Sequence, residues 1–305
     1  MRLVFAGTPA VAVPSLRALA NGPHEIAAVV TRSDAPLGRK RVLTPSPVAH
    51  AAEELGIPTI KADRLDADAT ARIAALEPEL GVIVAYGGLV REPLLSTPAH
   101  GWINLHFSLL PRWRGAAPVQ RALIAGDRET GASVFQLVAE LDAGDVFAEE
   151  RCEVPWNATA GDMLDALAET GAPLLARVVD GIADGSAVAV PQHGEPTLAP
   201  KLTLDDGALD FSLDAETLRA RIAGVTPEPG AHTTFEGARL KVLRAAASTA
   251  DPVPPGRVVA SGRDILVGTA TSPLRLETVQ PAGKGAMPAG DWFRGLRVEN
   301  PELGS

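Results

Sequence analysis

The feature that most constrains this chain is a regular alternation of short apolar runs with amphipathic segments over its first 190 residues. Continuous apolar runs such as Leu3–Ala6 and Leu80–Tyr86 are typical of strands that are buried on both faces. Segments with the apolar period of a helix, such as Val13–Leu19, lie between these runs. Strands that alternate with helices in this way predict an α/β fold with a Rossmann-like, mostly parallel sheet. The other predicted strands are Ile26–Thr31, Ile57–Ile60, Gly101–His106, Ala132–Val138 and Phe147–Glu153, and the other predicted helices are Ser46–Leu55, Ala67–Leu76, Gly115–Ala125 and Ala160–Gly181.

The character of the sequence changes after residue 190. The segment Pro191–Thr203 contains three prolines and has no apolar period, which is typical of a linker. One predicted helix follows, Ala215–Ile222, and then short strands separated by turns rich in Gly, Pro and Asp. Such strands predict a smaller β-barrel domain, for which the oligonucleotide-binding (OB-like) type is one candidate. We therefore predict an α/β domain over residues 1–190, a linker over 191–203, and a C-terminal β-barrel over 204–305 with strands at Arg239–Leu243, Gly256–Ala260, Ile265–Gly268 and Leu274–Val279.

Length and composition exclude several classes of protein. The chain has 305 residues, of which 46% are hydrophobic and 21% charged, so it can bury a core in two domains and is not disordered. Its single cysteine, Cys152, excludes an internal disulfide framework and a four-cysteine zinc site. The net charge of −9 argues against a protein that coats nucleic acid through bulk positive charge, but it is compatible with a small basic patch.

The N-terminus resembles an export signal only weakly. Its apolar run, Leu3–Ala6, has four residues before the Gly7-Thr8-Pro9 turn, whereas an export signal needs about 7–15. No stretch approaches the ~18 uninterrupted apolar residues of a membrane span. We therefore expect a cytoplasmic protein with no membrane segment.

One segment reverses the acidic charge of the first domain. Residues 31–50 carry four basic side chains and one acidic side chain. Two interpretations remain open: a solvated loop, or a flexible finger that binds the phosphates of a nucleic acid. Prolines and glycine in the segment break both helix and strand, so they predict a long exposed loop. The basic residues are Arg32, Arg39, Lys40 and Arg41, the acid is Asp34, and the breaking residues are Pro36, Gly38, Pro45 and Pro47.

The usual cofactor-binding motifs are missing from the sequence. The turn after the first strand, Gly7-Thr8-Pro9-Ala10, lacks the G-x-G-x-x-G of a dinucleotide site, and no G-x-x-x-x-G-K-S/T phosphate loop occurs. A dehydrogenase and a P-loop ATPase are therefore disfavoured. The histidines are dispersed without the spacing of metal ligands, so no metal site is predicted.

The strongest chemical signal lies at the end of the predicted strand Gly101–His106. Side chains alternate between the two faces of a strand, so Asn104 and His106 project to the same side with Cα atoms about 6.6 Å apart. They sit at the carboxyl end of the strand, where open α/β sheets bind ligands. An N-x-H pair alone is a weak signal, because a single histidine at a strand end is often structural. The string N-x-H-x-S-L-L-P-x-x-x-G is far more specific.

A second candidate is the acidic turn Leu141-Asp142-Ala143-Gly144-Asp145. An aspartate in such a turn can simply form the turn, or it can be delivered to a site by the loop beyond a strand. Asp142 and Asp145 are three residues apart, so composition does not choose between them.

The sequence of this chain resembles the 10-formyltetrahydrofolate-dependent transformylases over nearly its whole length. The resemblance is carried by residues 103–127 (INLHFSLLPRWRGAAPVQRALIAGD), by Val-Ala-Tyr-Gly at 84–87 and by LDAGD at 141–145. It extends to Phe-Ala-Gly-Thr-Pro at 5–9, to Leu-Thr-Pro-Ser-Pro at 43–47 and to Gln-Pro-Ala-Gly-Lys at 280–284. The R-W-R-G-A-A-P string, the basic loop and the second domain point to the branch that acts on tRNA.

The resemblance implies an enzyme that moves a formyl group from 10-formyltetrahydrofolate to the α-amine of methionyl initiator tRNA. It also implies a tRNA-binding C-terminal domain and a basic loop that contacts the acceptor arm. Two positions depart from the family, Phe107 where a smaller residue is usual and Glu228 where tryptophan is typical. The implied site residues are Asn104, His106 and Asp142 as the catalytic trio, Ser108, Leu109, Leu110 and Pro111 as the folate-contacting segment, and Arg39, Lys40 and Arg41 as the tRNA contacts.

The trio suits formyl transfer. Asn104 can donate a hydrogen bond to the oxyanion of a tetrahedral intermediate. His106, if protonated, offers a second donor and can pass a proton on, and Asp142 would favour the imidazolium and orient the ring.

Two alternative functions are kept: a formyltransferase for a small amine (a nucleotide-sugar or glycinamide ribonucleotide), and a non-catalytic RNA-binding protein. Nothing in the sequence requires a partner subunit, so a monomer is expected.

Overall fold

The structure is a computed structural model that describes residues 1–38 and 41–304. The chain forms two compact units. The first unit comprises residues 1–118, 129–153 and 164–199, and the second comprises residues 119–128, 154–163 and 200–305. Most of the segment predicted as a linker, up to Ala199, thus belongs to the first unit.

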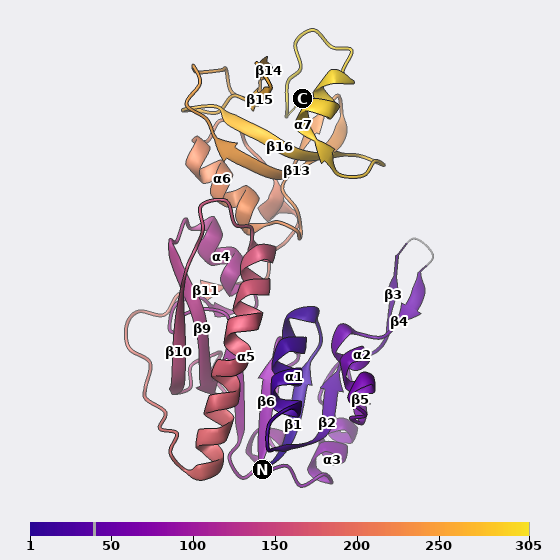
Figure 1. Cartoon of the computed structure of the whole chain (residues 1–305), viewed down its shortest axis with the longest axis vertical. Coiled ribbons are helices and arrows are strands. Elements are labelled where there is room, and N and C mark those ends of the chain that lie inside the picture. Colours follow the sequence, from indigo (N-terminus) through magenta and orange to yellow (C-terminus); the bar gives the residue numbers. More distant parts are fainter. Residues whose placement is uncertain (39–40, 305) are drawn as a thin grey trace. The chain divides into compact units, whose positions relative to one another are not determined.

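The first unit is built on a seven-stranded sheet in the order β10-β9-β7-β6-β1-β2-β5 (Figure 1). Neighbouring strands from β7 to β5 run parallel, and β9 and β10 add an antiparallel edge. The prediction of a mostly parallel α/β sheet is therefore confirmed. The strands are β1 (Arg2–Gly7), β2 (Glu25–Thr31), β5 (Thr59–Lys61), β6 (Leu80–Val84), β7 (Trp102–His106), β9 (Glu129–Gln136) and β10 (Val146–Glu153).

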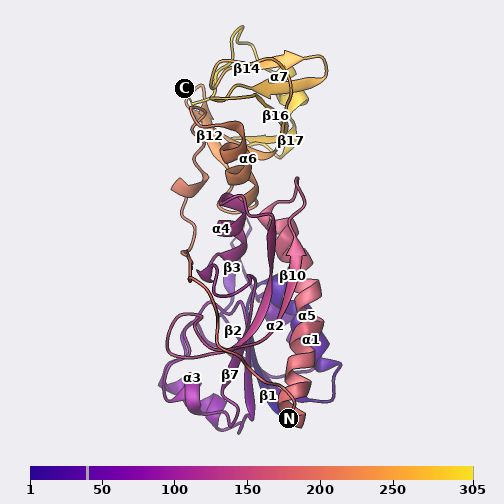
Figure 2. The same cartoon turned by 90° about the vertical axis from the view of Figure 1, so that its left-hand side faces the viewer.

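Helices cover both faces of this sheet, and Figure 2 shows α3 and α5 on opposite sides of it. On the α3 side, Ile73 joins a buried cluster with Trp102 of β7. Two helices begin where the sequence supplies a cap: Ser46 accepts a hydrogen bond from the Ala49 amide, and Asp66 accepts one from the Ala69 amide. The helices are α1 (Val13–Ala20), α2 (Pro47–Glu54), α3 (Ala67–Ala74) and α5 (Ala160–Asp184), with short 3-10 helices η1 (Ala10–Ala12) and η2 (Leu94–Ser96).

The basic segment differs from its prediction. It contains a two-stranded antiparallel hairpin of β3 (Ala35–Leu37) and β4 (Val42–Thr44), which projects away from α2 in Figure 1. The expectation that its prolines exclude a strand was wrong. Pro36 lies within β3, where an isolated hairpin leaves one side of each strand without a partner and the missing N–H costs no hydrogen bond. Of the three predicted tRNA contacts, Arg39 and Lys40 lie outside the described residues.

The second unit is a curled antiparallel sheet in the order β12-β13-β16-β15-β14, with β17 paired to β16. Helix α6 packs against β13, and apolar residues of α6, of strands β13 to β16 and of α7 contribute to the core. The predicted barrel-like domain is confirmed in this open, curled form. Helix α4 (Pro118–Ile124) belongs to this unit from residue 119 onward. The other elements of the unit are η3 (Asp205–Gly207), α6 (Ala215–Gly224), β12 (His232–Phe235), β13 (Ala238–Ala247), β14 (Val258–Ser261), β15 (Asp264–Val267), β16 (Leu274–Pro281), β17 (Met287–Pro288) and α7 (Ala289–Arg294).

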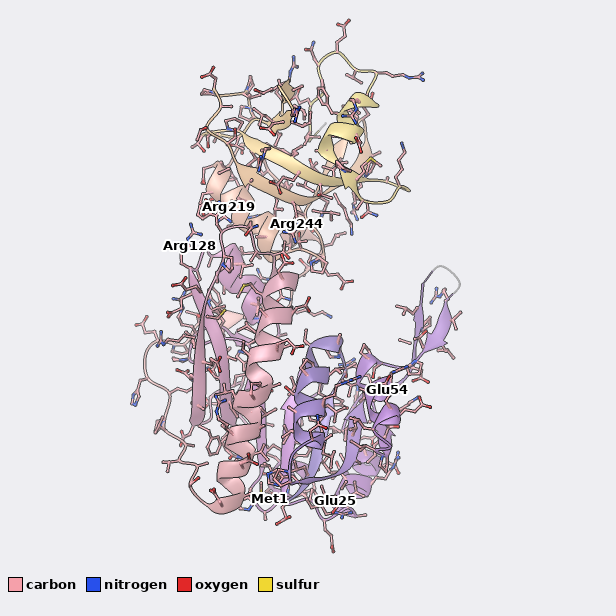
Figure 3. The ribbon with its side chains drawn as sticks, viewed as in Figure 1. Met1, Glu25, Glu54, Arg128, Arg219 and Arg244 are labelled. Atoms are coloured by element: carbon pink, nitrogen blue, oxygen red, sulfur yellow. The ribbon has the colours of Figure 1, made fainter. Side chains whose placement is uncertain are left out.

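Within the second unit, an arginine–tryptophan stack joins residues 119–128 and 154–163 to helix α6. The guanidinium carbons of Arg128 and Arg219 each lie 3.9 Å from the centroid of the Trp156 ring. Arg219 also donates a hydrogen bond of 2.8 Å to the Trp156 carbonyl. Arg244 of β13 forms an ion pair of 2.9 Å with Asp162. The three arginines, labelled in Figure 3, come from different segments of the unit, so these contacts explain why residues distant in sequence belong together.

No helix in residues 1–38 and 41–304 combines the length and the apolar character needed to cross a membrane.

Candidate active site

Strand β7 delivers two polar side chains to one face of the sheet. Trp102 faces the α3 side, where it is fully buried. Leu105 faces the opposite side, where its side chain lies against Gly171 of α5. Alternation along the strand therefore places Asn104 and His106 on the same face as Trp102, at the carboxyl end of β7. Asn104 is half-buried, whereas His106 is only 6% exposed.

The His106 ring is held at both nitrogens. Its Nε2 lies 2.9 Å from the carbonyl oxygen of Trp113. Because a carbonyl can only accept, this hydrogen bond requires the proton on Nε2. Nδ1 lies 3.8 Å from the Asp142 Oδ2. In the neutral ring Nδ1 therefore presents its lone pair towards a carboxylate, and no hydrogen bond joins the two until one of them gains a proton.

Asp142 is placed by an unusual turn after β9. Its φ is +45°, in the left-handed region that few residues other than glycine adopt. Gly144 follows in a close approach, since a Cβ there would lie 1.8 Å from the Gln136 carbonyl oxygen. The Asp142 Oδ2 accepts a hydrogen bond of 2.7 Å from the Gly115 amide. The structure thus brings Asp142 to His106, while Asp145 is exposed.

Burial favours the neutral form of His106. It lowers the pKa of His106 below its ordinary value, while the Asp142 carboxylate and the hydrogen bond to Trp113 raise that pKa by less. Asp142 therefore acts in the expected direction, but desolvation outweighs it. The imidazole is mainly neutral near pH 7, with its proton on Nε2.

The segment predicted to contact folate is bound into the protein mainly by its own backbone. The Ser108 hydroxyl is buried and donates to the Arg112 carbonyl at 2.7 Å. The Ser133 hydroxyl accepts from the Leu110 amide at 3.2 Å and lies 2.7 Å from the Ser108 carbonyl. Leu110 is also buried, whereas Leu109 is partly exposed. Pro111, which ends the segment, is buried as well, so Leu109 is the residue of this segment that is partly exposed.

The loop after this segment was predicted to start a helix at Gly115, which was wrong. Residues Arg114–Gly115 form a short strand, β8, which pairs in parallel with β11 (Leu198–Ala199). A Cβ at Gly115 would lie 2.7 Å from the Ala199 carbonyl oxygen, so this pairing requires glycine. The helix begins instead at Pro118, a residue favoured in the first turn of a helix.

Sequence reasoning missed the residues that support the site from the segment 191–199. The Thr197 hydroxyl accepts a hydrogen bond of 2.9 Å from the Trp113 amide, and Gln192 contacts the backbone of the Asp142 turn. These contacts join residues 50 or more positions apart, and no local pattern in the sequence signals them. Within the described parts of the chain, no group of three or more His, Cys, Asp or Glu side chains could hold a metal ion.

Comparisons with known proteins agree on a family. A model described as formyl transferase matches residues 1–179, and one described as formyl transferase, C-terminal domain, matches residues 201–297. A methionyl-tRNA formyltransferase of Clavibacter sepedonicus is 65% identical over 98% of this chain and 99% of its own length.

Two solved structures show the same fold at low sequence identity. A methionyl-tRNA formyltransferase from Clostridium thermocellum aligns with a TM-score of 0.57 and 14% identity, over 82% of this chain and 95% of its own. An N-formyltransferase from Helicobacter canadensis, in complex with folinic acid and dTDP-3-aminofucose, aligns with a TM-score of 0.69 and 14% identity, over 92% of this chain and 98% of its own. With the matches to both domains and to a close relative, these comparisons show that the chain belongs to the formyl transferase family.

Proposed function

We propose that this chain is an enzyme that transfers the formyl group of 10-formyltetrahydrofolate to the α-amine of methionyl initiator tRNA. The observation that carries the proposal is the buried His106–Asp142 pair beside Asn104, in a chain 65% identical to a protein named methionyl-tRNA formyltransferase. The proposal also places the reaction in the cytoplasm, because aminoacylated tRNA is used there. It further includes a monomeric enzyme.

Formyl transfer places three demands on the site. The amine nitrogen forms a bond to the formyl carbon, the carbonyl oxygen becomes an oxyanion, and the bond from that carbon to the folate nitrogen then breaks. Asn104 meets the second demand, because its amide N–H can donate to the developing oxyanion without adding charge. Removing one such donor typically lowers the rate by about 10²–10³-fold.

The first and third demands share one proton: the amine must lose it as it attacks, and the folate nitrogen must gain it as it leaves. The His106–Asp142 pair can carry this proton. The neutral His106 can accept the proton of the attacking amine at Nδ1, because Nε2 is already protonated and bound to the Trp113 carbonyl. The resulting imidazolium lies 3.8 Å from the Asp142 carboxylate, which stabilises it as an ion pair. The same proton can then pass to the folate nitrogen as it leaves, so the pair returns to its starting state.

The folate is expected to contact the outer surface of residues 108–111. This segment begins two residues after His106, the last residue of β7, and Leu109 in it is partly exposed. Backbone donors and acceptors with an apolar side chain suit a flat, polar-edged ring. The proposal therefore assigns Ser108, Leu109, Leu110 and Pro111 to the folate by position, with the Ser108 hydroxyl occupied internally.

The tRNA is expected to contact the β3–β4 hairpin. Arg41 adds positive charge there, and the side chains of Leu37, Val42 and Leu43 are 66%, 59% and 68% exposed. Charge on such a projecting element suits the phosphates of an acceptor arm. Arg39 and Lys40 remain part of the proposed contact on the basis of the sequence alone.

The alternative of a small-amine formyltransferase receives support only at the level of the fold. The Helicobacter canadensis protein shares the architecture at 14% identity, whereas the match to the Clavibacter relative extends over both domains. A non-catalytic RNA-binding protein would leave the buried, charge-tuned His106–Asp142 pair without a use.

A formylation assay with three acceptors tests the proposal. Purified protein and 10-formyltetrahydrofolate are incubated with methionyl initiator tRNA, with an amino-sugar nucleotide, or with glycinamide ribonucleotide, and formylated product is quantified. We expect product with the tRNA only. Faster formylation of either small amine, or no product with any acceptor, would overturn the proposal.

A further inference from the structure

Gln192 lies 50 residues beyond Asp142 in the chain but contacts the backbone of its turn. The Gln192 side-chain nitrogen donates to the Asp142 carbonyl and to the Gly144 carbonyl, each at 2.8 Å. One side chain thus bridges two residues of the turn whose backbone is constrained, Asp142 with its left-handed φ and the closely packed Gly144.

The other end of the Gln192 amide is held by Arg114. Its Oε1 accepts from the Arg114 Nε at 3.1 Å and from Nη2 at 2.6 Å. A guanidinium can only donate and a carbonyl can only accept. The oxygen of the amide must therefore face Arg114 and its NH₂ must face the turn, so the orientation of Gln192 follows from its partners.

These contacts complete a ring of interactions around the proposed catalytic pair. The carbonyl of Trp113 holds His106, the amide of Gly115 holds the Asp142 carboxylate, and the residue between them, Arg114, holds Gln192. Gln192 then holds the backbone of Asp142 itself. Each member of the pair is thus tied to the same three-residue loop, and Gln192 is the only described side chain in the ring that links this loop to the turn backbone.

We propose that Gln192 is a positioning residue, which fixes the Asp142 carboxylate relative to His106 by holding the Asp142–Gly144 turn. This inference rests on the proposed function. Gln192 donates to backbone carbonyls and takes no part in proton transfer. Its removal should therefore lower kcat through misplacement of Asp142 and leave the KM for both substrates nearly unchanged.

Two substitutions separate geometry from charge. Gln192→Glu keeps the size of the side chain and a partner for Arg114 but cannot donate to the two carbonyls. Gln192→Met removes the hydrogen bonds without adding charge. Because misplacement of a reacting group by about 1 Å can cost about 10²-fold in rate, we expect both variants to lower kcat by about 10- to 100-fold. Gln136→Glu is the matched control, since the Gln136 side-chain nitrogen also donates to a backbone carbonyl, that of Trp102 at 2.9 Å, at the opposite end of β7 from His106.

A double-mutant cycle gives the readout that a merely structural role would not produce. If Gln192 acts through Asp142, the substitutions should lower kcat much less in an Asp142→Asn background than in the native enzyme. Thermal unfolding of each variant is measured alongside. Should Gln192→Glu fail to fold, Gln192→Met and Arg114→Lys carry the same test, with a smaller loss expected for lysine because it keeps one donor.

The outcomes distinguish this inference from the proposed function. Native kcat in folded Gln192 variants would overturn it, and so would an equal loss with and without the Asp142 carboxylate, provided that the native enzyme formylates methionyl initiator tRNA. Absence of formylation by the native enzyme would instead contradict the proposed function. A selective loss of kcat that disappears in the Asp142→Asn background supports the positioning role.

Discussion

The proposed catalytic cluster and the β3–β4 hairpin belong to the same unit but are stabilised in opposite ways. His106 and Asp142 are 6% and 9% exposed, and the residues that hold them lie between 7 and 50 positions away in the chain. The hairpin is held by three local cross-strand pairs and exposes the side chains of Leu37 and Leu43. A hairpin of this size has little stability of its own. Proton transfer requires fixed distances, whereas an exposed element can adjust to the surface that it binds.

This comparison predicts a division of labour between the two regions. Substitutions in the cluster should lower kcat with little effect on tRNA affinity. Substitutions in the hairpin should lower tRNA affinity and its salt dependence with little effect on kcat at saturating tRNA. The three predictions below test this division, from the largest expected effect to the smallest.

Asn104→Ala should have the largest effect of the three. Loss of the oxyanion donor should lower kcat by about 10²–10³-fold. The dissociation constant for methionyl initiator tRNA, measured by filter binding, should stay within about twofold of the native value, because loss of a transition-state donor need not affect ground-state binding. A weaker tRNA complex with kcat preserved would place Asn104 in binding rather than in chemistry.

The pH dependence of the rate should reveal the neutral His106. Burial lowers the pKa of His106, so kcat/KM should fall only as the pH drops through a value below the ordinary histidine pKa of about 6.5. Because the Asp142 carboxylate raises the pKa of His106, Asp142→Asn should move this acidic limb to still lower pH in the residual activity. The limb belongs to the coupled pair and is read from rates at saturating folate. A limb above the ordinary histidine value, or one that moves up, would contradict this account.

Arg41→Ala should have the smallest effect. Removing one phosphate contact should reduce the slope of log affinity against log salt concentration by about 1. Maximal kcat should be unchanged. The matched control is Arg177→Ala, an exposed arginine on α5 that pairs with Glu150, and it should leave the slope unaltered. If both variants change the slope equally, the hairpin has no special role in tRNA binding.

The sequence predicted those features that depend on local patterns. The strand Trp102–His106 and the shared face of Asn104 and His106 follow from period-two alternation. The proline rule failed at Pro36, because an unpaired strand edge tolerates a residue without an N–H. The predicted helix start at Gly115 failed because that glycine pairs with Ala199, more than 80 residues away.

The support of the site could not be predicted from local patterns. Composition left Asp142 and Asp145 equivalent, and only the family resemblance favoured Asp142. What separates them is a contact with His106, 36 residues earlier in the chain. Gln192 gave no signal at all, since it lies in a proline-rich stretch typical of a linker. Its hydrogen bonds to the Asp142 turn join residues 48 and 50 positions apart, which only the folded unit brings together.

The most direct test of the central claim is the single-turnover rate of formylation for His106→Ala, Asp142→Asn and the double variant. If the two side chains handle one proton together, either single substitution should lower the rate by about 10²–10⁴-fold. The double variant should then be nearly as fast as the slower single variant. A double variant whose loss equals the product of the two single losses would show that His106 and Asp142 act independently.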